Sequence, residues 1–490
     1  MGISRNSRRD FLRNMGCLAC GGTAAALLPQ LHMMGTALAD TSAATGYKAL
    51  VCVYLYGGND AWNMLVPFDT ARYNTYATSR SGVYNAASNP GGLALPLPAA
   101  SARIVDGNDP SSATNQYFLH PAMPEMTTLF NQGKLAFVVN AGSLVKPITM
   151  ADYTANSANY PQQLFSHADQ TNQWQQAFAQ QGVTLGWGGQ CGDTLKPGNA
   201  NTQLSPCISI AGANRFQVGT NTIPYQMSSG GLTSLSAMCN PTPCASGTSN
   251  TSVRDKALQI LLGDTYANDF AGGYAATFKR GRDLNNLLSA GLGGTTLTTT
   301  FPPNNSLAAQ LQTVAKMIKL SVAQNYATRQ IYFVTMGSFD LHSGMMTGGN
   351  SDHAALLTTL SQALNAFWTS MGPTDVNAQN NVTVFTMSEF ARTLQSNGSG
   401  SDHGWGTVQM ALGGGVHGGR LYSNGGGPIT GFPNQALNAP NNFSRGQMIP
   451  GIGVEQYAAT LAQWMGISVS QCNTIFPNLT KFGANNLGFV

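Results

Sequence analysis

The stretch KALVCVYLYGG, residues 48–58, is a continuous run of apolar, β-branched and aromatic residues that ends in two glycines. Such a run predicts a buried strand that opens into a loop. Similar runs occur at residues 134–142 (KLAFVVNAG), 331–337 (IYFVTMG) and 382–388 (VTVFTMS), and a weaker one at 207–212 (CISIAG). Because these runs do not alternate between apolar and polar residues, they are typical of strands covered on both faces, as in a parallel sheet.

Helical patterns lie between these predicted strands. Apolar residues recur every three or four positions within residues 306–322 and again within 353–368. The order helix, strand, helix, strand over residues 306–388 is a β/α crossover pattern. We therefore predict an α/β fold, a three-layer α/β/α sandwich with a mainly parallel sheet, which residues 46–490 form as a single domain. Residues of about 185–250 and 285–305 show little periodicity, and we expect loop insertions there.

The first residues predict export. Residues 7–13 (SRRDFLR) hold an arginine pair followed by Phe-Leu, an apolar stretch follows, and residues 37–39 (ALA) form a small-x-small cleavage signal. This is the pattern of a Tat signal peptide, so we expect residues 1–39 to be removed and the mature protein to be periplasmic or secreted. The apolar stretch is too short for a stable membrane span.

The net charge of the chain argues against nucleic acids and anionic membranes as partners. Of the 24 basic and 20 acidic residues, four and one lie in residues 1–39, so the mature chain is close to neutral. A neutral chain argues against nucleic acid or an anionic membrane as a partner. The sequence does not predict the oligomeric state.

Six cysteines lie beyond the predicted signal. An oxidising compartment permits disulfides, so Cys239 and Cys244 could close a small loop and Cys191 and Cys207 a larger one. Cys52 lies within an apolar strand and is expected to be a buried free thiol.

Acidic and imidazole side chains follow three of the predicted strands. Asp60 follows the first strand, Asp340 and His342 follow the strand at 331–337, and Asp402 and His403 lie in GSDHGWG, residues 400–406. Ligands of open α/β sheets bind at the carboxyl ends of strands, so we expect these side chains to converge. Clustered carboxylates repel one another unless a cation lies between them. The alternative is that they are ordinary turn residues.

The types of ligand narrow the choice of metal ion. Mixed Asp and His ligands suit zinc or manganese, whereas all-oxygen sites suit magnesium or calcium, which stay open as alternatives. His417, flanked by glycines, is either a further ligand or a structural residue. His120 is expected to pack or cap a helix, and His353 to lie at the surface.

Two more residues are candidates for catalysis. Ser166 precedes a predicted helix, where it would be either a nucleophile or a helix cap. Arg392 would either bind a non-bridging oxygen of a tetrahedral anion or form a salt bridge with Glu389.

Six motifs also resemble those of a known family. They are LYGGNDAWNMLVP, FLHPAMPEM, LFSHADQTNQW, FDLHS, TMSEFARTLQSNGSGSDHGWG and GGGVHGGRL. Their order resembles that of the bacterial family called domain of unknown function 1501, whose members typically carry Tat signals. That family is placed near the alkaline phosphatase and sulfatase superfamily, which implies an alkaline-phosphatase-like fold with metals at the strand ends.

The resemblance also implies roles for single residues. Asp60, Asp402 and His403 would bind one metal, and Asp340, His342 and His417 a second. The chain departs from the superfamily at the second metal, where Asp340 and His342 are only two positions apart and Gly344 stands in place of the expected His. It also lacks the Cys-x-Pro-x-Arg motif of sulfatases.

Two functions follow as expectations. The first is an exported, metal-dependent hydrolase of small phosphate or sulfate esters, with Ser166 or a metal-activated water as nucleophile and Arg392 on the substrate. The second is a secreted binding or assembly protein that uses the same fold without turnover. Its neutral, Asn- and Gln-rich surface would suit glycan or protein contacts.

Overall fold

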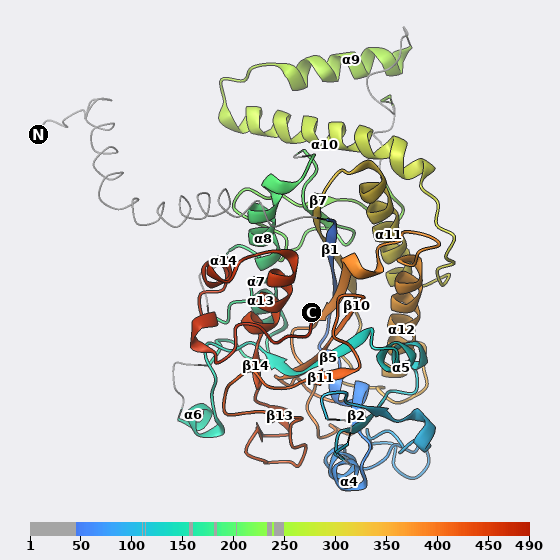
Figure 1. The fold of residues 1–490 in the computed structure, drawn as a ribbon, viewed down its shortest axis with the longest axis vertical. Helices are drawn as coiled ribbons and strands as arrows, with labels where there is room; N and C mark the ends of the chain where they lie inside the picture. Colours follow the sequence, from blue (N-terminus) through green and yellow to red (C-terminus); the bar gives the residue numbers. More distant parts are fainter. Residues whose placement is uncertain are drawn as a thin grey trace, which may run out of the picture.

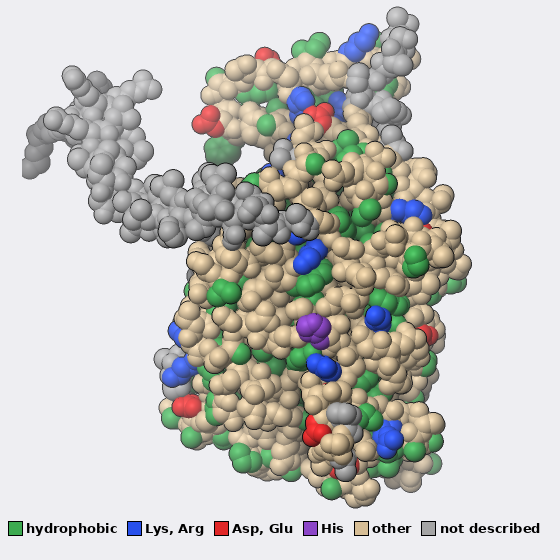
Figure 2. All heavy atoms as spheres, viewed as in Figure 1, with side chains coloured by type: hydrophobic (Ala, Val, Ile, Leu, Met, Phe, Trp, Pro, Cys, Tyr) green, Lys and Arg blue, Asp and Glu red, His purple; other side chains and the backbone are tan. Residues whose placement is uncertain are grey.

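A computed structural model describes residues 46–490 apart from 110, 113, 156–159, 181–183, 202, 233–237 and 240–248. The predicted signal peptide, residues 1–39, lies outside the described residues. Figure 1 gives the arrangement of the elements around a central sheet, and Figure 2 shows that charged side chains are sparse on the viewed face. This agrees with a charged fraction of only 9%.

The five apolar runs all form strands of the central sheet. These are β1 Lys48–Leu55, β5 Leu135–Gly142, β6 Cys207–Ser209, β8 Arg329–Met336 and β9 Val382–Met387. Four further strands join them: β7 Tyr225–Gln226, β10 Thr407–Gly413, β11 Arg420–Tyr422 and β14 Ile452–Gly453. The strand order is β11-β5-β10-β9-β1-β8-β6-β7, with β14 beside β5.

The sheet is mainly parallel, as predicted. β1 pairs in parallel with both β8 and β9, and β6 pairs in parallel with β8. The exception is β10, which runs antiparallel to β5 and β9. β10 follows β9 through a return loop without an intervening helix, and such a connection joins antiparallel neighbours.

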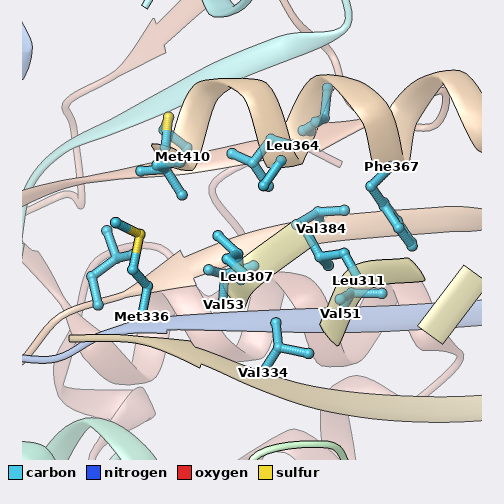
Figure 3. Packing of buried hydrophobic residues seen from close by; sticks show 14 of the residues in the cluster. Val51, Val53, Leu307, Leu311, Val334, Met336, Leu364, Phe367, Val384 and Met410 are labelled. Carbon is cyan, nitrogen blue, oxygen red and sulfur yellow. The ribbon is translucent and has the colours of Figure 1, made fainter. Parts of the chain in front are cut away.

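Helices cover both faces of this sheet. Alternate side chains of β1 enter different cores: Val51 and Val53 enter one, and Cys52 and Tyr54 enter the other. In the first core, residues of β1, β8 and β9 pack against two helices, as Figure 3 shows. Burying each Val or Leu side chain there contributes about 1.5–3 kcal/mol. The result is three layers, α/β/α.

The first face is covered by α5 Pro124–Asn131, α11 Ser306–Gln324 and α12 His353–Ser370. The second face is covered by α7 His167–Gln176, α8 Trp187–Leu195, α13 Val454–Met465 and α14 Val469–Ile475. Smaller elements are α3 Ala61–Met64, α4 Thr70–Ser79, α6 Met150–Thr154, and strands β2 Leu65–Pro67, β3 Ile104–Val105, β4 Gln116–Leu119, β12 Asn442–Phe443 and β13 Gln447–Met448. Short 3-10 turns lie at Ala100–Ala102, Lys196–Gly198, Gln379–Asn381 and Leu479–Lys481.

The two segments expected to be loops are partly regular structure. The first contains α8, β6 and β7, and Trp187 of α8 is fully buried. Its helical periodicity is hidden because Gly188 and Gly189 stand where a larger side chain would strike Phe216 and the backbone of Val218. In the second segment, the residues up to Gly294 complete α10 Asp269–Gly294, which forms a hairpin with α9 Asn250–Gly263 (Figure 1).

The cysteines follow the prediction only in part. Cys52 is a buried free thiol, as expected, and Cys472 is another. The predicted bridge between Cys191 and Cys207 is wrong, because both are buried free thiols and the Cys207 Sγ hydrogen-bonds the carbonyl of Gly188 at 3.6 Å. Cys239 is disulfide-bonded, whereas its predicted partner Cys244 lies outside the described residues.

A search of the described residues for membrane spans found no helix with both the length and the apolar character that crossing a bilayer requires.

Candidate functional site

The loops after β1, β8 and β9 meet at the carboxyl edge of the sheet. Two glycines allow this close approach. Gly57 has a φ of 114°, and a Cβ there would collide with the backbone nitrogen of Asp340. At Gly400, a Cβ would collide with the carbonyl of Leu341. The loop after β8 is therefore held between the loops that follow β1 and β9.

Four side chains gather where these loops meet, and we refer to His167, Asp340, His342 and His403 as the His/Asp cluster. The Nε2 of His403 lies 3.1 Å from the Nε2 of His167 and 3.0 Å from the Nε2 of His342. The Asp340 carboxylate lies between them, with Oδ2 3.4 Å from His167 and Oδ1 3.1 Å from His342 and 3.4 Å from His403.

Each imidazole of the cluster is oriented by an acceptor at its other nitrogen. The Nδ1 of His167 lies 2.8 Å from Glu389 Oε1, that of His342 3.0 Å from Asp402 Oδ1, and that of His403 2.7 Å from the carbonyl of Phe165. A carboxylate or a carbonyl only accepts, so Nδ1 carries the proton in each ring. In the neutral rings, the Nε2 lone pairs then point toward one another.

Arg392 lies beneath the cluster and keeps the carboxylate of Asp340 ionised. Its side chain is fully buried and donates to Asp340 Oδ1 at 2.7 Å, to the carbonyl of Gly57 at 3.2 Å and to the carbonyl of Ser401. Partial burial alone would raise the pKa of Asp340, but the hydrogen bond and charge of Arg392 outweigh it and hold that pKa below its ordinary value. Asp340 is therefore an ionised carboxylate near neutral pH.

The pKa values of His167 and His403 are shifted in opposite directions. The hydrogen bond that His167 donates to Glu389 raises the pKa of His167, and the negative charges of Glu389 and Asp340 act in the same direction. Burial lowers the pKa of His403, which favours its neutral ring. Neutral imidazole and ionised carboxylate are the forms that bind metals.

Glu389 connects the cluster to the end of β1. It is 1% exposed, and its Oε1 also accepts the backbone N–H of Gly57 at 2.7 Å. Its Oε2 has no hydrogen-bond partner within the described residues. One carboxylate thus fixes both the tautomer of His167 and the path of the chain after β1.

Residues 312–428 match a family model. Its description is Protein of unknown function (DUF1501). The match supports the family resemblance of the motifs within these residues, which include Asp340, His342, Glu389 and His403. No curated protein and no solved structure matched the chain.

Within the matched residues, Asp402 lies beside the cluster. It accepts from His342 and from Asn397 Nδ2, each at 3.0 Å, and it pairs with Arg445. Burial opposes the shift, but the hydrogen bonds from Asn397 and His342 lower the pKa of Asp402. The expected convergence of residues 340, 342, 402 and 403 is thus present, with Asp402 supporting a histidine.

Two predicted ligands do not reach the cluster. Asp60 is buried and forms an ion pair with Arg80, which also donates to the carbonyl of Thr393 at 3.0 Å. Asp60 therefore lies beneath the site and stabilises the loop after β9. His417 follows the antiparallel strand β10, whose last residue is held against the start of β9, so His417 lies at the opposite edge of the sheet. Its Nδ1 donates to the carbonyl of Gly488 at 2.7 Å.

The two predicted catalytic residues have structural partners. Ser166 is the N-cap of α7: it accepts from the backbone N–H of Asp169, and its hydroxyl donates to the Asp169 carboxylate at 2.5 Å. Arg392 forms a salt bridge, as one of its two alternatives had it, but its partner is Asp340 in place of Glu389. A fully buried guanidinium with these partners is also not exposed to a substrate.

Sequence reasoning gave His167 and Glu389 no role at the metal site. His167 follows β5, but α6 and a long loop separate the two. Glu389 is the second residue after β9, and this position at a strand end could have indicated that it lies at the site. His353 corrects another expectation: it is fully buried, with its Nε2 3.0 Å from Asn59 Oδ1, because it lies beneath the loop after β1. Of the two expectations for His120, packing is confirmed, because it is buried and accepts the N–H of Ala122 at 3.1 Å, whereas α5 has no side-chain cap.

Proposed function

We propose that this protein is a metal-dependent hydrolase of phosphate or sulfate esters, and that His167, Asp340 and His403 hold a divalent cation. The supporting observation is the orientation of the imidazoles. With each Nδ1 proton donated outward, the Nε2 lone pairs of His167 and His403 face each other across 3.1 Å. Lone pairs at this separation repel unless a proton or a metal cation lies between them, and a bound cation would take the place of the proton on His167.

The spacing of the ligand atoms supports the same proposal. Tetrahedral zinc with bonds of about 2.0–2.1 Å places its ligand atoms about 3.3–3.4 Å apart. The corresponding separations in the cluster are 3.1 Å between the two imidazoles, 3.4 Å from His167 to Asp340 Oδ2 and 3.4 Å from His403 to Asp340 Oδ1. Two imidazoles and a carboxylate favour zinc or manganese over magnesium or calcium.

The side chains of the site would have different roles in hydrolysis. A bound divalent cation would act as a Lewis acid toward the ester oxygens. Glu389 and the carbonyl of Phe165 orient the two imidazole ligands, and Arg392 keeps Asp340 ionised. The side chain of His342 is 45% exposed and paired with Asp402, so its Nε2 would accept a proton from the attacking water.

In the proposed reaction, the water oxygen bonds to phosphorus or sulfur while the bond to the ester oxygen breaks. The proton that His342 accepts from the water then passes to the ester oxygen, which leaves as the alcohol. Water is favoured over Ser166 as the nucleophile because the Ser166 hydroxyl is committed to Asp169. Arg445, which is partly exposed beside Asp402, would attract an anionic ester to the rim of the site. An alkaline-phosphatase-like fold is part of this proposal, supported by the three layers and by the location of the cluster at the strand ends.

The decisive experiment measures bound metal and hydrolysis in parallel. Purified protein is expected to hold about one zinc or manganese ion per chain and to cleave a nitrophenyl phosphate or sulfate. His403→Ala should lose both properties, whereas His417→Ala, a histidine variant at the opposite edge, should keep both. A folded protein that takes up neither metal, or that binds it equally after His403→Ala, would contradict the proposal.

We propose export by the Tat pathway together with this function, on the basis of the arginine pair in residues 7–13. Cell fractionation of the full chain should find the protein in the periplasm or the medium. Replacing Arg8 and Arg9 with lysine should retain it in the cytoplasm. Equal export of this variant would contradict the Tat assignment.

A surface hollow favours a second candidate function, glycan binding. The hollow has a volume of about 490 Å³, and its lining combines the polar residues Glu125, Thr299, Gln362, Asn365 and Thr369 with the apolar residues Phe301, Pro302, Pro303 and Ala366. Amides, hydroxyls, one carboxylate and an aromatic ring suit a neutral, hydroxyl-rich ligand. Calorimetric titration with oligosaccharides tests this function. Binding that Asn365→Ala weakens, in a protein that hydrolyses no ester, would favour this function over the hydrolase.

A further inference from the structure

The α9–α10 hairpin extends away from the body of the molecule. In Figure 1 it lies at the top, with α9 outermost and α10 between α9 and the sheet. The second half of α10 is anchored, because Leu284 and Leu288 are buried in the first core. The first half and α9 carry large apolar side chains with exposed fractions between 57% and 91%, namely Val253, Ile260, Leu261, Phe270 and Tyr274.

The apolar side chains of α9 form a stripe along one face. Val253, Ala257 and Ile260 are spaced by four and three residues and therefore share a face. Asp255 lies on another face and forms an ion pair with Arg282 of α10. The stripe is therefore directed away from α10 and into solvent. Figure 2 shows hydrophobic spheres at several places on the hairpin.

The exposed apolar surface of the hairpin as a whole is large for a monomer. At about 150–250 Å² for a large side chain, the exposed fractions correspond to roughly 600 Å² per copy. The largest apolar patch of an ordinary monomer is about 300–600 Å² and is itself often functional.

We propose that this hairpin is the interface between two copies of the chain, with their α9 helices antiparallel across a two-fold axis. The charges at the ends of α9 favour this arrangement. Arg254 and Lys256 are exposed near its start, and Asp264 and Asp269 are exposed beyond its end. An antiparallel pairing centred on Ile260 places Lys256 of one copy beside Asp264 of the other, and does so twice. A parallel pairing would place like charges together.

The near-neutral charge of the chain supports self-association, since long-range repulsion between copies is weak. Lys256 and Asp264 are eight residues apart, which in one helix is about 12 Å. They are therefore too far apart to pair within a copy. Exchanging the charges of Lys256 and Asp264 by substitution therefore tests whether two copies are in contact.

The test is the molar mass of the full protein by light scattering after size-exclusion chromatography, over a range of concentrations. The wild type is expected to be a dimer. Ile260→Asp should raise the dissociation constant at least tenfold, because it places a carboxylate at the centre of the apolar interface. Ile223→Asp is the matched control, since Ile223 is 59% exposed but lies outside the hairpin. This control should remain dimeric.

Charge reversal tests the orientation. Lys256→Asp should weaken the dimer, and adding Asp264→Lys should restore it. A wild-type protein that is monomeric at every concentration, or a dimer indifferent to Ile260→Asp, would overturn the proposal. A monomer that binds anionic lipid vesicles only when Ile260 is intact would assign the surface to lipid and also overturn it. Circular dichroism of each variant confirms that the helices are retained.

Discussion

At the scale of single residues, Glu389 is important for metal binding although it is not one of the proposed ligands. It is buried, it accepts from the Nδ1 of His167 and it accepts from the N–H of Gly57. We predict that Glu389→Gln lowers zinc affinity about 10–100-fold, the usual cost of removing a carboxylate that orients a histidine ligand. Competition with a chromophoric chelator measures this affinity without reference to activity.

The matched control is Glu125→Gln, which alters a glutamate bonded to Ser361 at 2.6 Å on α12. It should leave zinc affinity unchanged. A Glu389→Gln protein with wild-type affinity would show that the orientation of His167 does not depend on this carboxylate. A variant that loses affinity together with its fold would be uninformative about orientation, so near-UV circular dichroism accompanies the titration. Glu389→Asp, which keeps the charge, should recover part of the lost affinity if the charge matters.

At the scale of elements, the strands and helices that the sequence predicted are those with a long apolar pattern. β1, β5, β8 and β9 were predicted because each is a long apolar run covered on both faces. β10 was not predicted, because TVQMALG begins with two polar residues among its first three and follows a glycine-rich turn. The glycines of α8 likewise remove the apolar periodicity by which helices are recognised.

The same reasoning explains the success and the errors at the site. Residues within a few positions of a strand end, such as Asp340 and His403, were placed at the correct edge because strand direction fixes that edge. His417 was assigned to the wrong edge, since the reversal of β10 was unknown. Asp60 was placed in the correct region, but its burial and its pairing with Arg80 depend on contacts between distant segments.

The N-terminal turn of α13 holds a buried carboxyl group that couples stability to pH. Burial raises the pKa of Glu455 to about 8, although hydrogen bonds from Asn478 act in the opposite direction. In the unfolded chain a glutamate has a pKa of about 4.3. The folded state therefore keeps its proton over a pH range in which the unfolded state releases it.

We predict that this group's stabilising contribution is complete below about pH 4 and is lost as the pH rises toward about 8, where the folded group also ionises. The slope is at most about 1.4 kcal/mol per pH unit. Urea unfolding at several pH values between 5 and 8 measures it. Glu455→Gln does not titrate, so the difference in unfolding free energy between variant and wild type should increase in the variant's favour with pH. A difference independent of pH would contradict the assignment.

At the scale of the whole molecule, the proposed ligands come from three distant parts of the chain. His167 begins α7, Asp340 follows β8 and His403 precedes β10. Unfolding separates these segments, so a cation held by all three would bind the native state and not the unfolded chain. Binding of this kind stabilises the fold by mass action, by about 2.7 kcal/mol at a free metal concentration of 100 times the Kd.

We therefore predict that zinc or manganese raises the midpoint of thermal unfolding by about 3 °C for a chain of this length, and that a chelator reverses the increase. Calorimetry with and without metal measures the shift. Asp340→Asn should abolish it, even though the variant also loses the pairing with Arg392 and is less stable in itself. The comparison remains valid because each protein is compared with its own metal-free form, so the intrinsic destabilisation cancels and only the metal-dependent difference remains. An equal shift in wild type and Asp340→Asn would place the bound metal elsewhere and remove the physical basis of the hydrolase proposal.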